Sequence, residues 1–100
     1  MEEYSENNLI SYRKSIDRLD TILIHTLAER FQKTNEIGFF KARKNLPSFD
    51  GVREKDQMIK FKKLAKENDL DPKMIANFFK LIISEVKKNH EAIKKNIKQT

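Results

Sequence analysis

Two cations lie on a helical face that should otherwise be hydrophobic. At about 100° per residue in an α-helix, Leu19 and Leu23 fall within about 20° of Arg30, which places Arg30 on the midline of an apolar stripe. Lys41 lies eleven residues further on, or about three turns, and returns to within about 20° of Arg30. An unpaired charge in an apolar interior is costly, so each cation needs an anion or a wet site. Arg30 and Lys41 are therefore candidate ligands of an anionic molecule.

A carboxylate, an imidazole and a third cation extend this pattern. Glu54 continues an apolar stripe of a later segment, and His90 flanks another stripe near the C-terminus. Arg13 lies about 100° from Arg30 around the first helix, so it would face a neighbouring molecule. If the stripes meet, Glu54 and His90 surround one interior volume together with Arg30 and Lys41. The surplus of positive charge in such a volume suits a dianion.

Each of these residues also has a purely structural explanation. Arg30 and Glu54 could form a buried ion pair, and Lys41 could extend to solvent at a helix C-terminus. Arg13 could pair with an acidic side chain four residues on. His90 could be a core histidine whose hydrogen bonds are satisfied. The sequence leaves these explanations open.

Other catalytic chemistries are not indicated. The chain has no Cys, and its two His residues have no second ligand at metal-binding spacing. No Gly-rich loop precedes a helix to hold a phosphate, and no nucleophile stands out. An enzyme with these residues would act by binding and electrostatic preorganisation. We therefore expect neither a metal nor a cofactor.

The composition favours a small helical protein. The chain has 100 residues with a net charge of +6, only two Gly and two Pro, and all of the positive excess lies in residues 51–100. That excess is typical of a solvated Lys-rich face, although a basic half can also bind a polyanion. The Lys-rich stretch 87–98 lacks the aromatic and Arg residues that nucleic acid would require. No apolar run is long enough for a membrane span, and we expect a cytoplasmic protein.

Helix signals predict one all-α domain over residues 1–100, with helices at about 6–44, 51–67 and 72–97. Asp50 and Asp71 are placed as N-caps, and Pro72 suits the first position of a helix. The first helix would be more than ~50 Å long, whereas a compact domain of this size has a radius of gyration of about 13 Å. We therefore predict an intertwined homodimer. The alternative is a break near Gly38 and a monomeric four-helix bundle.

A family resemblance runs in order through most of the chain. The residues that carry it are Tyr12-Arg13-Lys14-Ser15-Ile16-Asp17-Arg18-Leu19-Asp20, Leu27-Ala28-Glu29-Arg30, Ile37-Gly38, Lys41, Leu46-Pro47, Asp50, Arg53-Glu54, Leu70-Asp71 and Phe79-Lys80-Leu81-Ile82-Ile83. Their order and spacing resemble the all-helical chorismate mutases. The resemblance implies a domain-swapped dimer of three-helix protomers. It also implies a pericyclic rearrangement of chorismate to prephenate, in aromatic amino acid biosynthesis, without a cofactor.

The resemblance also implies roles for particular residues. Arg30 should bind one substrate carboxylate, and Arg13 from the partner chain should bind the other. Lys41 should donate to the ether oxygen, which gains negative charge as its C–O bond breaks.

On the other side of the substrate, Glu54 should accept a hydrogen bond from the ring hydroxyl, and Asp50 and Arg53 should contribute nearby. These roles suit the chemistry of the side chains, because planar Arg forks match carboxylates and a Lys ammonium matches one developing oxyanion.

Two positions depart from the family pattern. Val86 stands where the family commonly has a Ser near a carboxylate, with Lys87 beside it as a substitute. His90 stands where the family usually has Gln or Glu as a second donor to the ether oxygen. We predict that His90 acts as this donor and makes turnover sensitive to pH between about 5 and 8, where histidine titrates.

These departures leave two alternatives open. Isochorismate-pyruvate lyases are similar to the chorismate mutases in fold and in their cationic site, so the substrate could be isochorismate. Asp50, Arg53 and Glu54, however, follow the mutase pattern. A non-catalytic basic helical module is the alternative from a different functional class.

Overall fold

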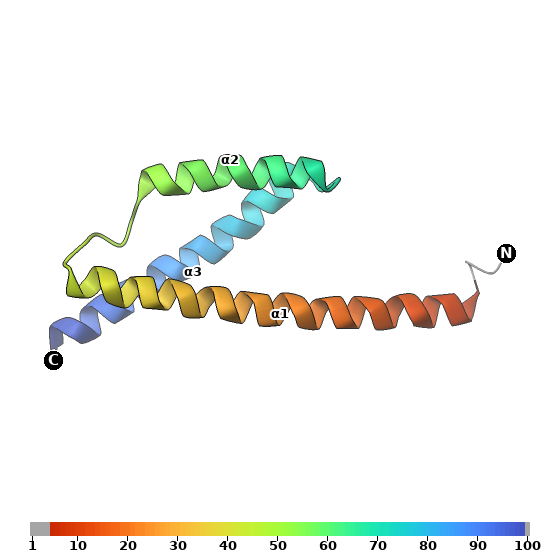
Figure 1. The fold of residues 1–100 in the computed structure, drawn as a ribbon, viewed down its shortest axis with the longest axis horizontal. Coiled ribbons are helices and arrows are strands. Elements are labelled where there is room, and N and C mark those ends of the chain that lie inside the picture. The colour runs from red at the N-terminus through yellow and green to blue at the C-terminus, as the bar shows by residue number, and fades with distance from the viewer. Residues whose placement is uncertain (1–4, 100) are drawn as a thin grey trace. The chain divides into compact units, whose positions relative to one another are not determined.

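Residues 5–99 form three helices joined by a loop and a turn. The structure is a computed structural model that describes residues 5–99, and it contains no strand within that range. Helix α1 spans Glu6–Arg43, α2 spans Gly51–Glu67 and α3 spans Pro72–Gln99 (Figure 1). The all-α class with one very long first helix is confirmed. α1 ends one residue before its predicted end, and α3 extends two residues beyond it.

Capping residues begin α2 and α3 where the sequence predicts them. The Asp50 carboxylate accepts a hydrogen bond from the backbone N–H of Arg53 at 3.1 Å. The Asp71 carboxylate accepts one from the N–H of Lys73 at 2.9 Å, and Pro72 is the first residue of α3. Each cap satisfies an amide that the helix itself leaves without a partner.

The C-terminal ends of α1 and α2 share one type of turn. After α1, the N–H of Leu46 donates to the carbonyl of Lys41 at 2.8 Å, and Asn45 adopts a φ of 55°. Asp69 takes a φ of 56° in the equivalent turn after α2. A left-handed residue just past a helix end allows these backward hydrogen bonds to form. This turn ends α1, whereas α1 continues through Gly38, so the alternative of a break there is wrong.

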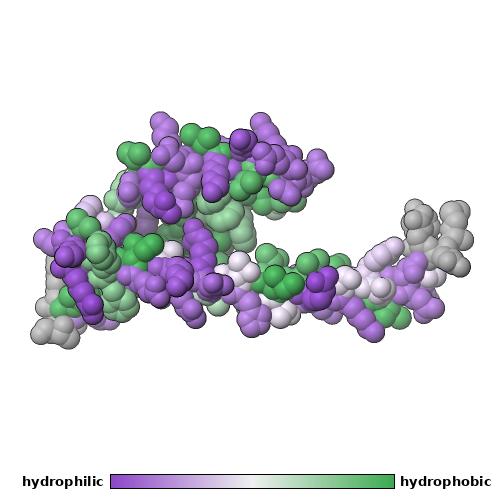
Figure 2. All heavy atoms as spheres, in the orientation of Figure 1, coloured by the Kyte–Doolittle hydropathy of each residue, from purple (hydrophilic) through white to green (hydrophobic). Residues whose placement is uncertain are grey.

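The chain divides into two compact units, Met1–Lys33 and Thr34–Thr100. That residues 1–100 form one domain stays a prediction. In the first unit, hydrophobic side chains of α1 reach the surface among polar ones (Figure 2). The large hydrophobic residues of this unit that are exposed are Leu9, Ile10, Tyr12, Ile16, Leu19, Ile22, Leu23 and Ile24.

The second unit holds the buried core, where α2 and α3 pack together. The rings of Phe61 and Phe79 stack with their centroids 3.8 Å apart. Ala65, Ala76 and Ile82 are the buried hydrophobic residues of the described chain. None of its helices combines the length and the hydrophobicity needed to cross a membrane.

Candidate active site

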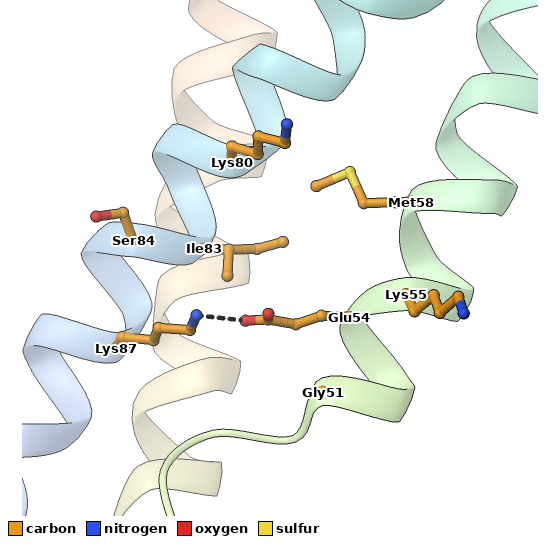
Figure 3. Close-up of a pocket in the computed structure, with 8 residues that line it drawn as sticks. All are labelled: Gly51, Glu54, Lys55, Met58, Lys80, Ile83, Ser84 and Lys87. Carbon is orange, nitrogen blue, oxygen red and sulfur yellow. Dashed lines mark ion pairs between the residues drawn. The ribbon is translucent and has the colours of Figure 1, made fainter.

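A pocket of about 410 Å³ lies between α2 and α3 (Figure 3). Its lining residues are Gly51, Glu54, Lys55, Met58, Lys80, Ile83, Ser84 and Lys87. The side chains of Glu54 and Met58 on α2 point toward those of Lys80, Ile83 and Lys87 on α3, whereas Lys55 and Ser84 point away (Figure 3). The pocket therefore combines apolar walls with two cations and one carboxylate.

An ion pair joins the two helices at one end of this pocket. Lys87 Nζ lies 3.0 Å from Glu54 Oε1, and the two side chains are 42% and 27% exposed. The same ammonium lies 4.4 Å from the centroid of the Phe49 ring. The ion pair therefore places two opposite charges side by side at the edge of a partly apolar pocket.

Lys41 is held near the end of α1 by the loop that follows it. Its ammonium donates to the backbone carbonyl of Ser48 at 3.4 Å, and Ser48 Oγ donates to Glu91 Oε1 on α3 at 2.8 Å. A second pocket of about 710 Å³ opens beside this loop. Lys41 and Asp50 both line it, together with Leu46, Pro47, Phe49, Gly51, Val52 and Lys55.

Asp50 and Arg53 lie together at the start of α2. The Asp50 carboxylate is engaged as the helix cap. Both residues line a third pocket, of about 530 Å³, together with other residues of α2. A capping carboxylate keeps free lone pairs, so Asp50 can still accept another hydrogen bond.

His90 is buried, with 5% of its surface exposed. Its Nε2 lies 2.7 Å from the carbonyl oxygen of Thr34. A carbonyl only accepts, so Nε2 carries the hydrogen of this bond. Nδ1 is buried and has no hydrogen-bond partner in the described part of the chain, and the same holds for the side-chain oxygen of Asn35. A core histidine with satisfied hydrogen bonds would have a partner at both ring nitrogens, whereas His90 has one at Nε2 only.

The structure of one chain brings only some of the expected site residues together. Glu54 and Lys87 share the first pocket, while Lys41 and Asp50 share the second. Arg13 and Arg30 belong to the other unit. Val86 is half-buried on α3. That these residues converge on one substrate stays a prediction.

Sequence reasoning did not single out Lys80, Met58 or Ile83 as site residues. Lys80 precedes Lys87 by two helical turns on the same face of α3, and this spacing is the signal that could have identified it. In residues 5–99, no cluster of three or more His, Asp or Glu side chains could hold a metal ion.

Comparisons with known proteins identify the family and relatives of this chain. Residues 12–91 match the family model described as chorismate mutase type II. The bifunctional chorismate mutase/prephenate dehydratase of Buchnera aphidicola is 36% identical over 81 residues, which are 81% of this chain and 21% of that relative. The Escherichia coli K12 protein of the same name is 37% identical over the same shares of both chains.

A shorter relative is similar in length to this chain. The chorismate mutase of Methanocaldococcus jannaschii is 29% identical over 75 residues, 75% of this chain and 76% of that protein. By contrast, the chain spans only about a fifth of the length of the bifunctional relatives. Because the family model covers most of the sequence, the chain belongs to the chorismate mutase type II family.

Proposed function

We propose that this chain converts chorismate to prephenate in aromatic amino acid biosynthesis. The observation that carries the proposal is the family match over residues 12–91, because this range includes every expected site residue from Arg13 to His90. The pocket between α2 and α3 supports it. Its inward side chains are two ammonium groups, one carboxylate and apolar groups, which suits a dianion with a carbon ring.

The reaction breaks one C–O bond and forms one C–C bond within a single molecule, so it needs no nucleophile or cofactor. The protein would bind the folded conformer of chorismate and stabilise negative charge on the departing ether oxygen. Lys41 and His90 would donate to that oxygen. Glu54 would accept from the ring hydroxyl, and Asp50 and Arg53 would support this end of the site.

The two carboxylates of chorismate would be bound by cations. Arg30 would form a forked pair with one carboxylate, and Arg13 from a partner chain would bind the other. Val86 is apolar and cannot contact a substrate carboxylate as the Ser common at this position would. The neighbouring Lys87 would provide that polar contact instead.

The proposed assembly is a homodimer in the cytoplasm. The exposed hydrophobic residues of α1 support it, because a helix of 38 residues gains most of its stability from packing an apolar face. Arg13 lies on this helix. If α1 packs against a partner chain, Arg13 can reach the active site of that partner.

A direct assay tests the function. Purified protein should consume chorismate and release prephenate, and Arg30→Ala should lower kcat/KM by more than about tenfold, because a carboxylate loses a charge-assisted ligand. Arg18→Ala is the matched control, since Arg18 is exposed on the same helix and should leave kcat/KM unchanged. No turnover of chorismate, or release of pyruvate from isochorismate in its place, would contradict the proposal.

A further inference from the structure

The pocket between α2 and α3 has a different chemistry at each end (Figure 3). Lys80 lies at one end, and the Lys87–Glu54 pair lies at the other. Ile83 and Met58 lie between them, from opposite walls. A molecule that fills this pocket meets a cation, then an apolar middle, then a second cation beside a carboxylate.

Helix geometry places the two ammonium groups along one line. Lys80 and Lys87 are separated by two turns of α3, which gives an angular offset of about 20° and a rise of about 10 Å. Long Lys side chains can lean toward each other over such a distance. Their ammonium groups can therefore contact two anionic groups of one small molecule.

The two lysines differ in what neutralises them. Lys87 already pairs with Glu54 and lies over the Phe49 ring. Lys80 is an exposed residue that lines the pocket with its side chain on the side facing α2, and within residues 5–99 it has no hydrogen bond or ion pair with another residue. Lys80 is thus the cation of this pocket that is available to a ligand without breaking an existing pair.

We infer that Lys80 is a further substrate-binding residue, which binds a carboxylate of the substrate at the end of the pocket opposite Glu54. The inference rests on the proposed function and adds a residue outside the expected site. The order of groups in the pocket fits part of that substrate. A carboxylate, a carbon ring and a ring hydroxyl match Lys80, then Ile83 and Met58, then Glu54.

The expected effect is on binding. Lys80 would contact the carboxylate in both the ground state and the transition state, so its loss should raise KM and leave kcat almost unchanged. For a partly solvated charge-assisted hydrogen bond, we expect KM for chorismate to rise about tenfold in Lys80→Met. Lys80→Arg keeps the charge and should recover most of the affinity.

Lys88→Met is the matched control. Lys88 is exposed on the same helix, and its loss removes the same charge outside the pocket lining. Any change in long-range attraction of the substrate is therefore common to both variants. Titration calorimetry with prephenate provides a second measurement, in which Lys80→Met should weaken binding and Lys88→Met should not.

The possible outcomes distinguish the role of Lys80 from the proposed conversion of chorismate. Wild-type turnover together with equal KM values for Lys80→Met and Lys88→Met would overturn the assignment of Lys80 and leave the proposed function standing. A wild-type protein that converts no chorismate would overturn both. Circular dichroism of each variant checks the fold, and Lys80→Gln repeats the test with a polar side chain.

Discussion

At the scale of the residue, the hydrogen bonds of His90 restrict the form in which it could donate to a substrate. Its Nε2–H is occupied by the Thr34 carbonyl, and Nδ1 is buried without a partner in the described chain. A neutral ring in this tautomer presents only an acceptor at Nδ1, whereas the imidazolium presents a donor. The donor role proposed for His90 therefore requires the doubly protonated ring.

This requirement sets the sign of a pH dependence. The doubly protonated ring loses a proton as pH rises, so we expect kcat/KM of the wild type to fall with rising pH. His90→Gln should have a flat profile, because an amide donates whatever the pH. His25→Gln is the control, since His25 is exposed on α1 and its loss should leave the wild-type profile intact. A flat wild-type profile would exclude the imidazolium as the donor.

At the scale of the element, Gly38 allows α1 to approach α3. A Cβ at this position would lie 2.7 Å from His90 Cδ2 and 3.0 Å from Ile93 Cδ1. The imidazole is buried and held by Thr34, so it cannot move away at low cost. The absence of a side chain at Gly38 thus permits the hydrogen bond that ties the end of α1 to α3.

Gly38→Ala should therefore destabilise the protein even though Ala favours a helix. Overpacking of a filled contact costs about 1–3 kcal/mol, which exceeds or offsets the gain of about 1 kcal/mol in helix propensity. Urea unfolding at one fixed protein concentration measures the difference.

The same substitution in a His90→Ala background provides the control, because the obstructing ring is gone. There, Gly38→Ala should be neutral or stabilising. Equal effects in the two backgrounds would show that the ring does not restrict position 38.

At the scale of the whole molecule, the proposed dimer explains why α1 exposes so many hydrophobic residues. Among the large side chains of the first unit, Leu23 is 62% exposed and Ile24 is 69% exposed. An isolated helix with such a surface would be marginal in water. A second copy of the chain is the partner that we propose for it, and light scattering should give the mass of a dimer.

A mixing experiment tests whether Arg13 acts in the partner's site. Arg13→Ala and Lys41→Ala should each be nearly inactive, because every site in either homodimer lacks one cation. When the two variants are unfolded and refolded together, hybrid dimers contain one intact site, and about a quarter of wild-type activity should return.

Arg30→Ala mixed with Lys41→Ala is the matched control. Both residues would act in the site of their own chain, so no hybrid dimer contains an intact site and no activity should return. Failure of the Arg13 mixture to regain activity would mean that Arg13 does not act across the interface.

Helix boundaries followed from local signals that the sequence alone contains. Asp50 and Asp71 cap α2 and α3 at the predicted positions, because capping depends on residues within one turn. The predicted end of α1 was one residue too late. The residue in the left-handed turn after this helix is Asn45, whereas Gly is the residue that commonly marks such a turn. Periodicity also placed Glu54 and Lys41 at partly buried positions.

The pairing of side chains between helices was decided only by the tertiary structure. Periodicity gives the direction of a side chain around its own helix, but it gives neither the neighbouring helix nor the height at which the two meet. For this reason the sequence identified Glu54 as a charged residue on an apolar face but did not predict its ion pair with Lys87. It identified His90 but not the Thr34 carbonyl that engages Nε2. The place of Lys80 in the lining of the pocket depends on how α2 and α3 pack, so it became visible only in the folded chain.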